Sequence, residues 1–340
     1  MDNAPNAGAG QQSFDRVHAH LLRLFPELVD SLGGDPAALM RAAGIEDMEC
    51  RQATYRQAID LLDVASRVLE CADLGLRLAA VQLGGGVFGP LGLAMKNSPT
   101  FGDAIAYVRE HAYAHSLAAR IWQERRGDML FVGHDVLIDH PADRRQAIEH
   151  LLLSGHLSAM EITGGHARAR RIHFQHQRIS SPALYRRYFG CEVRFGQDAD
   201  GVLFAERDLA ARIVDPDAKA YAAATAFIDA EFTCHQPPFH AQARGVLMRL
   251  LAGGDSSNAR VARELNIHLR TLHRRLRAEG TSFRKLKDEV RRDALLYYTQ
   301  QTRLDFARIS ERLGFAEQSV MTRSCNRWFG MSPTRLRAGR

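Results

Sequence analysis

The chain carries one helical pattern twice near its C-terminus, and this repeat limits the folds open to it more than any other feature. Nine positions match between the two copies, at a spacing that grows from 48 to 50 residues. The matched pairs are Val261 and Ile309, Leu265 and Leu313, Ile267 and Phe315, Leu272 and Met321, Arg274 and Arg323, Leu276 and Cys325, Gly280 and Gly330, Ser282 and Ser332, and Leu286 and Leu336. Each copy has the order helix, short turn, helix and glycine stop, which is that of a helix-turn-helix.

The residues around the two copies predict helices as well. The stretch 282–301 has apolar residues at helical spacing, and "DSSN" at 255–258 offers Asp and Ser as caps for the helix that follows it. We therefore predict an all-α domain at 241–340. In this domain, helix-turn-helix units at about 258–280 and 306–329 are joined by a long helix.

The second helix of each unit combines apolar and polar positions. Val261, Leu265, Ile267, Leu272 and Leu276 are expected to close a small core between the two helices of the first unit. The remaining residues are candidates for DNA contact, because Arg grips guanine edges, Gln pairs with adenine, and Ser or Thr at a helix N-terminus suits phosphate. They are Arg270, Thr271, His273, Arg274 and Arg277 in the first unit, and Gln318, Ser319, Thr322, Arg323 and Arg327 in the second.

The distribution of charge decides between DNA contact and simple solvation of these arginines. A lone arginine on a helix is usually only solvated. From Ala241 onward, however, the chain has 21 Lys and Arg against 9 Asp and Glu, a net charge of +12, while the rest has a net charge of −6. A basic module attached to an acidic one is expected when only one of the two meets a polyanion.

The first 240 residues mix helical and strand periodicities, which predicts an α+β domain. The Gly- and Pro-rich stretch 84–92 is expected to interrupt the helices. The predicted helices are at 14–29, 55–70, 98–112 and 145–163. The predicted strands are a hairpin within 117–136, a strand within 169–177, and a later strand pair at 191–195 and 201–205.

Domain boundaries follow from local composition. Residues 1–18 lack the basic segment and the apolar segment that a signal peptide has. We expect them to form a disordered tail. Residues 19–233 form the α+β domain, and the Pro237-Pro238 pair marks a linker at 234–240. The five cysteines are dispersed and lack CxxC spacing, which predicts no disulfide framework. The sequence has no 18-residue apolar run, which predicts no transmembrane helix and no membrane partner. We therefore expect a cytoplasmic protein.

The C-terminal part resembles the AraC/XylS family of bacterial transcriptional regulators. The stretches "RTLHRRLRAEGTSF" and "ISERLGF…RWFGMSP" carry the resemblance over about 100 residues. It implies that each recognition helix enters one of two successive major grooves on one face of the DNA. By position, Arg270, His273 and Arg274 would then contact bases in the first unit, and Gln318, Ser319 and Arg323 in the second.

Three positions depart from the pattern of this family. Met321 and Cys325 stand where aromatic residues are usual, so we expect looser packing in the second unit. Asn326 stands where a basic residue is common, which implies one phosphate contact fewer. The first unit is therefore expected to supply more of the DNA affinity.

The N-terminal part resembles the arabinose-binding-like effector domain of one AraC-type subgroup. The stretches "FGPLGLAMKNSPTFGDAI" and "ALYRRYFGCEVRFGQDADGVLFAERDLA" carry this resemblance over about residues 20 to 215. It implies that 19–233 binds a small inducer and dimerises, without naming the inducer. A few of the aromatic residues Phe88, Phe101, Tyr107, Trp122 and Phe131 would line such a pocket, with Arg109 or His111 as polar anchors, and most of these aromatics are expected to be ordinary core.

Three other functions remain open. A metal-responsive regulator would use the pair His111 and His115, or His173 and His176, but a third ligand is missing from both patterns. A regulator with an enzymatic N-terminal domain would need a catalytic motif, and GxSxG, Walker A and Rossmann patterns are all absent. A DNA-binding protein without an effector would not need some 200 residues of α+β domain.

We therefore expect a ligand-responsive activator of a catabolic or metabolic operon, which is not an enzyme and needs no cofactor. Its expected partners are double-stranded promoter DNA, a small-molecule effector, a second copy of the chain in a homodimer, and RNA polymerase.

Overall fold

A five-stranded mixed sheet organises the first part of the chain, in the order β1-β2-β5-β3-β4. Its strands are β1 (Ala119–Arg126), β2 (Met129–Val136), β3 (Arg171–His173), β4 (Glu192–Arg194) and β5 (Gly201–Ala205). The predicted hairpin is confirmed, since β1 and β2 pair antiparallel. Its turn contains Gly127 with φ at 67°, a conformation that favours glycine. The computed structural model describes residues 15–17, 20–46, 53–138, 143–232, 238–252, 256–302 and 304–338.

The predicted pairing of the strands at 191–195 and 201–205 is wrong. β3 lies between β4 and β5, and it pairs parallel with β4 and antiparallel with β5. The physical reason is the connection from β3 to β4, which contains helix α9 (Pro182–Phe189). A crossover of this length returns the chain in the same direction, which gives a parallel pair.

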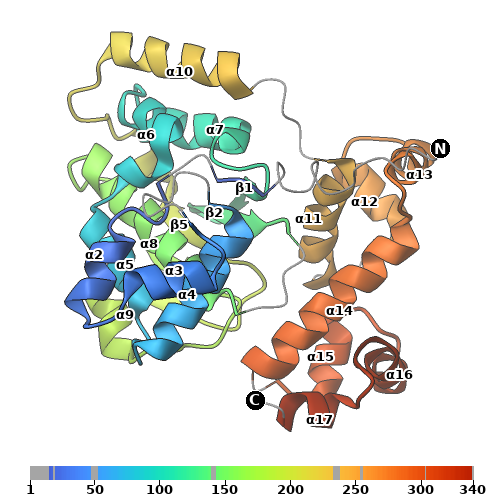
Figure 1. The fold of residues 1–340 in the computed structure, drawn as a ribbon. Coiled ribbons are helices and arrows are strands. Elements are labelled where there is room, and N and C mark those ends of the chain that lie inside the picture. The colour runs from blue at the N-terminus through green and yellow to red at the C-terminus, as the bar shows by residue number, and fades with distance from the viewer. Residues whose placement is uncertain are drawn as a thin grey trace, which may run out of the picture. The chain divides into compact units, whose positions relative to one another are not determined.

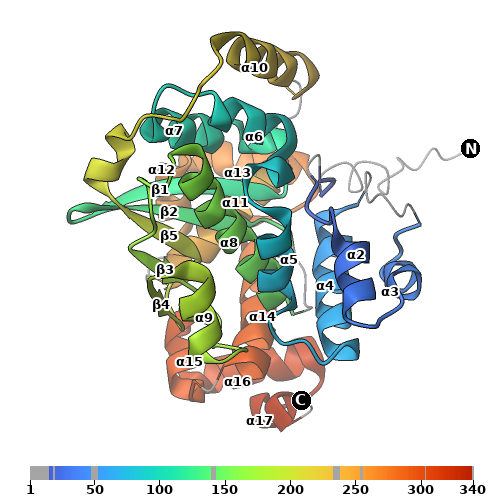
Figure 2. The same cartoon turned by 90° about the vertical axis from the view of Figure 1, so that its left-hand side faces the viewer.

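Helices surround this sheet, and α8 is the most deeply buried of them. α8 (Arg145–Ile162) packs against α4 and α5 on one side and contacts β5 on the other (Figure 2). The remaining helical elements of this part are α2 (Phe25–Ser31), α3 (Pro36–Ala42), α4 (Tyr55–Val68), α5 (Leu74–Gln82), η1 (Gly85–Phe88), α6 (Gly89–Lys96), α7 (Phe101–His111), η2 (Ala112–Ala114), η3 (Glu206–Ala210) and α10 (Ala218–Phe232).

The N-terminal boundary differs from the prediction. Of the expected disordered tail, residues 1–14 and 18 lie outside the described residues, but Arg16 forms a β-bridge with Thr54 and Val17 donates its amide to the carbonyl of Ala53 at 3.0 Å. The helix predicted at 14–29 begins only at Phe25. It cannot begin earlier because Leu24 has a left-handed φ of 63°.

The predicted break at 84–92 is confirmed only at its start. Gly84 has φ 86° and ψ −137°, a conformation restricted to glycine. From Gly85 the chain is helical again, first as η1 and then as α6, whose first turn holds Pro90. Proline is favoured there because the first amides of a helix need no intrahelical partner. The proline therefore starts α6 instead of preventing a helix.

Contacts divide the chain into two compact units, and the main body of the second runs from Pro238 to Arg340. This second unit is all-helical, as predicted. Its helices are α11 (Phe239–Ala252), α12 (Asn258–Glu264), α13 (Leu269–Ala278), α14 (Phe283–Gln301), α15 (Phe306–Arg312), α16 (Gln318–Phe329) and α17 (Pro333–Ala338). Of the linker predicted at 234–240, residues 234–237 lie outside the described residues, and α11 already includes its last two residues.

The long helix α14 joins two separate hydrophobic cores (Figure 1). Its first half supplies Phe283, Leu286 and Val290 to a core with α11, α12 and α13. Its second half supplies Leu295 and Tyr298 to a core with α15, α16 and α17. Each helix-turn-helix therefore has its own core, and α14 is the element they share.

Within the described residues, single helices are all too short or too polar to cross a bilayer, although the bent pair Leu74–Gln82 and Gly86–Lys96 meets the length and composition requirement.

Candidate DNA interface and apolar pocket

The turns of the two helix-turn-helix units have the same geometry. Asn266 in the first turn has φ 52°, and Gly314 in the second has φ 64°. The next residue in each turn makes a hydrogen bond back to the helix that precedes the turn. The Ile267 amide donates to the Ala262 carbonyl and the Phe315 amide donates to the Ser310 carbonyl, both at 3.0 Å. This is the αL helix ending that Gly and Asn adopt most readily. The repeat predicted from apolar spacing thus extends to backbone hydrogen bonds.

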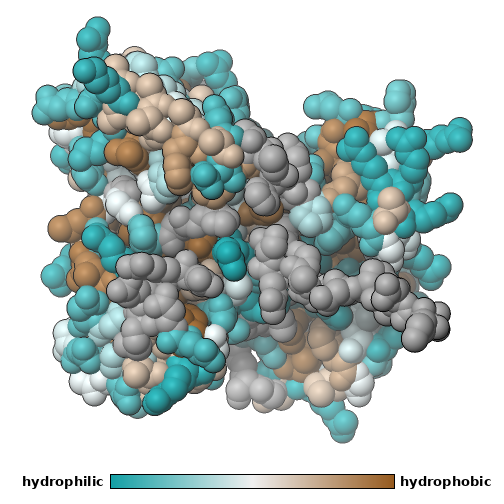
Figure 3. All heavy atoms as spheres, turned by 45° about the horizontal axis from the view of Figure 1, so that its top comes forward, coloured by the Kyte–Doolittle hydropathy of each residue, from teal (hydrophilic) through white to brown (hydrophobic). Residues whose placement is uncertain are grey.

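The recognition helix of the first unit, α13, separates core and surface as predicted. Leu272 and Leu276 are fully buried. Arg270, Arg274 and Arg277 follow one another at steps of four and three residues, which places them on one stripe of the helix opposite the two leucines. All three are exposed. Hydrophilic side chains project from this unit in Figure 3, at the edge where Figure 1 shows α13.

Two further candidates flank the stripe on α13. Thr271 is half-buried and His273 is exposed. The Nε2 atom of His273 lies 3.4 Å from the side-chain Nδ2 atom of Asn258, at the start of α12. His273 is therefore oriented toward α12, while the arginines of the stripe extend into solvent.

The recognition helix of the second unit, α16, is built in the same way with different side chains. Met321 and Cys325 are buried, and Ser319 and Arg323 occupy the opposite, exposed stripe. Gln318 is exposed at the N-terminus of the helix. The remaining candidate, Thr322, donates its hydroxyl to the Gln318 carbonyl at 3.0 Å. The outward stripe of α16 thus holds one arginine, whereas that of α13 holds three.

Arg327 is bound within the protein. Its guanidinium donates to the Asp288 carboxylate on α14 at 2.8 Å and lies 5.5 Å from the centroid of the Trp328 ring. The predicted DNA contact at this position would require the ion pair to open. The sequence spacing gave no signal for this contact, because Asp288 precedes Arg327 by 39 residues.

The second core contains aromatic side chains at positions other than 321 and 325. Both Met321 and Cys325 have no solvent exposure. Phe315, Trp328 and Phe329 pack against the same cluster. The Cys325 thiol donates to the Met331 carbonyl at 3.3 Å, just beyond the helix end at Gly330. Aromatic side chains thus contribute to the second core from positions other than 321 and 325, and the looser packing of this unit stays a prediction.

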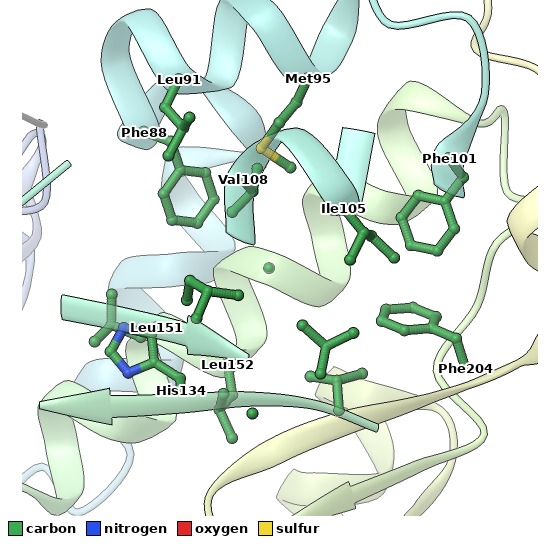
Figure 4. Close-up of a pocket in the computed structure, with 15 residues that line it drawn as sticks. Phe88, Leu91, Met95, Phe101, Ile105, Val108, His134, Leu151, Leu152 and Phe204 are labelled. Atoms are coloured by element: carbon green, nitrogen blue, oxygen red, sulfur yellow. The ribbon is translucent and has the colours of Figure 1, made fainter. Parts of the chain in front are cut away.

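The N-terminal unit contains a pocket between helices and sheet. It is lined by side chains of η1, α6, α7 and α8 on one side and of β1, β2 and β5 on the other, with an empty volume of about 740 Å³ that includes its opening (Figure 4). Alternation along the strands explains the lining, because Ile121, Val132, His134, Val202 and Phe204 share one face of the sheet. Phe101 and Phe204 meet edge to face, with centroids 4.9 Å apart.

His134 is the polar side chain of this pocket. Its Nε2 lies 3.5 Å from the Tyr55 hydroxyl, which is 3.0 Å from Nε2 of His115. Burial lowers the pKa of His134 to about 4, so the imidazole is neutral at pH 7. Its Nδ1 has no hydrogen-bond partner among the described residues. The Nδ1 atom is itself buried, so a bound molecule would reach it only if the imidazole turned toward the pocket.

Two of the five aromatic residues named from the sequence, Phe88 and Phe101, line this pocket. The other three are core residues. Trp122 and Phe131 pack together on the opposite face of the sheet, in a cluster with Leu203. Tyr107 packs against the cluster that holds α10 to α6.

Neither of the two predicted polar anchors lines this pocket. Arg109 pairs with the neighbouring Glu110 at 2.6 Å, and His111 stacks on Tyr107 with centroids 3.9 Å apart. His134 takes their place. It could have been found from the alternation of Leu130, Val132 and His134 in the predicted strand. Of the predicted metal-ligand pairs, His115 contacts Tyr55, and within the described residues no three His, Cys, Asp or Glu side chains converge as a metal site would require.

Comparison with known proteins identifies both halves of the chain. Residues 261–339 match the model of a helix-turn-helix domain. Residues 33–213 match the model of the N-terminal arabinose-binding domain of AraC transcription regulators. The HTH-type transcriptional regulator VirS of Mycobacterium tuberculosis is 32% identical over 325 residues, which cover 92% of this chain and 94% of VirS. The chain belongs to the AraC family of transcriptional regulators.

Other regulators match over a shorter stretch or at lower identity. The ornithine utilization regulator of Pseudomonas aeruginosa is 36% identical over 76 residues, or 22% of each chain. The crystal structure of the transcriptional regulator CdpR from Pseudomonas aeruginosa covers 89% of this chain and 96% of that one, with 23% identity and a TM-score of 0.44. Membership of the AraC family makes this chain a DNA-binding transcriptional regulator.

Proposed function

We propose that this AraC-family protein is a ligand-responsive regulator that recognises specific DNA sequences through α13 and α16. The observation that supports DNA recognition most strongly is the stripe formed by Arg270, Arg274 and Arg277, which is exposed and lies opposite the buried leucines of α13. An arginine stripe on the second helix of a helix-turn-helix is placed to contact base edges and phosphates in a major groove.

The roles of the individual residues follow from their places on the helices. Arg270, Arg274, Ser319 and Arg323 occupy the outward stripes and are proposed to contact bases. Arg277 continues the stripe of α13 toward the end of the helix. Thr271, His273, Gln318 and Thr322 flank the stripes and complete the interface. Arg327 is proposed to contact DNA only if its pair with Asp288 opens.

Helix ends support the same arrangement. α12, α14 and α15 begin with Ser257, Ser282 and Asp305, whose side chains accept hydrogen bonds from the first-turn amides. α13 and α16 begin without such a side-chain cap. Amides left free at a helix N-terminus are suited to phosphate oxygens, as is usual for recognition helices.

The apolar pocket supports the proposed response to a ligand. Leu91 on α6 lines the pocket and also belongs to the cluster with Ala224 and Ile228 of α10. α10 is the last described helix before the second unit. A molecule that changed the position of α6 would therefore act on the helix that leads to the DNA-binding unit. Homodimerisation and activation of a catabolic or metabolic operon through RNA polymerase complete the proposal, and they rest on the family alone.

A screen of small molecules tests ligand response directly. The full chain would be heated with amino acids, sugars, fatty acids, aromatic acids and neutral aromatic compounds, since a molecule that binds the folded state raises the unfolding temperature. Each hit would then be added to the protein on DNA selected from a random library. We expect at least one compound to change both the unfolding temperature and the DNA affinity. A set of hits that stabilise the protein without changing DNA affinity would contradict the proposal.

A further inference from the structure

We infer that the pocket of the N-terminal unit binds a neutral, mainly apolar molecule with one hydrogen-bonding group, and not a sugar or a charged metabolite. This inference rests on the proposed ligand response and names the class of its ligand. The family model that covers this unit is described as arabinose-binding, so the lining of the pocket is the observation that decides the class in this chain.

The lining is almost entirely hydrocarbon. Met95 contributes a thioether and His134 an imidazole. The other lining residues are Phe88, Leu91, Phe101, Ile105, Val108, Ile121, Val132, Gly133, Leu151, Leu152, Gly155, Val202 and Phe204. A pentose has a hydroxyl group on nearly every carbon atom. Most of these hydroxyls would lose water in the pocket without gaining a hydrogen bond, which opposes binding.

Charge excludes a second class of ligand. The described residues that line the pocket include no Lys, Arg, Asp or Glu. His134 is neutral at pH 7 because burial lowers its pKa to about 4. A carboxylate or phosphate in this pocket would therefore be buried without an opposite charge, and such burial is strongly unfavourable.

One polar group on the ligand is matched by His134. This side chain is 8% exposed, and its Nδ1 has no partner in the described structure. Figure 4 places His134 at one end of the pocket and the Phe101 and Phe204 rings at the other. A molecule with a hydroxyl or carbonyl group at one end and an aromatic or alkyl group at the other would satisfy both ends.

Gly155 offers a way to block the pocket without harming the fold. It lies within α8 and lines the pocket, and a Cβ atom added there meets no other atom within 4 Å. Because glycine is a poor helix former, both Gly155→Ala and Gly155→Leu are expected to keep or improve the stability of α8. Only the leucine has the volume to fill the pocket, so the alanine variant is a matched control.

The test is isothermal titration of the full chain with three probes, namely 4-propylphenol, 4-propylbenzoate and L-arabinose. We expect 4-propylphenol to bind wild type and Gly155→Ala at least tenfold more tightly than the other two probes. Gly155→Leu is expected to lose this binding, and His134→Leu to reduce the preference for the phenol over the benzoate.

Two results would overturn the inference, and neither would remove the proposed function. Binding of arabinose or 4-propylbenzoate that Gly155→Leu abolishes would show that the pocket binds another class of ligand. Equal binding of 4-propylphenol to Gly155→Leu and Gly155→Ala, or no binding to wild type, would show that the pocket does not take this class. The proposed function fails separately, when no compound of the wider screen changes DNA affinity.

Discussion

Arg291 of α14 donates from Nε to the main-chain carbonyl oxygen of Leu313, at the end of α15, with a distance of 2.9 Å. Its Nη2 atom donates to the next carbonyl, that of Gly314, and its guanidinium lies 4.4 Å from the centroid of the Phe315 ring. The last carbonyls of a helix have no partners within the helix, so this one side chain satisfies two of them. Arg291 thereby fixes the turn of the second helix-turn-helix to the helix that both units share.

Replacement of Arg291 by Ala is expected to weaken the second unit. Two hydrogen bonds from a charged group and one contact with an aromatic ring are lost, so we expect the free energy of unfolding to fall by about 2–3 kcal/mol. Urea denaturation of the full chain measures this fall. Arg292→Ala is the control, because the hydrogen bonds of Arg292 in the described structure go only to the neighbouring Asp293, which Arg244 still pairs after the substitution, so we expect a smaller loss. Equal losses in the two variants would show that Arg291 has no special role.

Arg327→Ala is expected to affect DNA binding less than Arg323→Ala does. Arg323 is exposed on the outward stripe of α16, whereas Arg327 is paired with Asp288 at 2.8 Å. We expect Arg327→Ala to cost less DNA affinity than the roughly 1–3 kcal/mol expected for the loss of a base contact, because Asp288 already engages the Arg327 guanidinium. Fluorescence anisotropy with DNA selected by the wild-type chain gives both values. A loss for Arg327→Ala as large as that for Arg323→Ala would mean that the ion pair opens on DNA.

The second unit was predictable in detail because its pattern is local. Helix-turn-helix units bury residues at short spacing, so the apolar positions, the cap at Ser257 and the glycine stops can be inferred from a few neighbouring residues. The contacts of Arg291 and Arg327 join residues 22 and 39 positions apart, and only the folded chain shows them.

The N-terminal unit was predictable only in part, because its pairings are distant in sequence. The β1–β2 hairpin has a local turn and was predicted correctly. The position of β3 between β4 and β5 depends on the crossover through α9, which periodicity does not reveal. The same limit applies to the pocket, since Phe101 and Phe204 meet across the domain while Trp122 faces the other side of the sheet.

Glu149 gives the protein a pH-dependent stability that can be isolated by one substitution. Its carboxyl group accepts a hydrogen bond from the Tyr185 hydroxyl at 2.5 Å, and burial raises its pKa from 4.5 to about 8. Between these values the folded chain holds a proton that the unfolded chain has released. The contribution of this bound proton to the free energy of unfolding is therefore complete below about pH 4.5. It declines as the pH rises toward 8, by up to about 1.4 kcal/mol per pH unit.

Glu149→Gln removes this titration and keeps an oxygen acceptor for Tyr185. Urea denaturation of wild type and Glu149→Gln at pH 5, 6, 7 and 8 should show wild type losing stability relative to the variant as pH rises. Buried histidines such as His134 and His150, whose pKa values are lowered to about 4, affect both proteins alike and cancel in the difference. Parallel stability curves for the two proteins would contradict the raised pKa.

Recognition of two separate DNA motifs by α13 and α16 can be measured by selecting binding sites from random-sequence DNA with the full chain. We predict two motifs separated by about 10 base pairs, one helical turn. Arg274→Ala should relax one base position in one motif and Arg323→Ala one position in the other, each at a cost of about 1–3 kcal/mol, with the larger loss for Arg274→Ala. A single motif, or a uniform loss of affinity for all sequences in both variants, would contradict the claim.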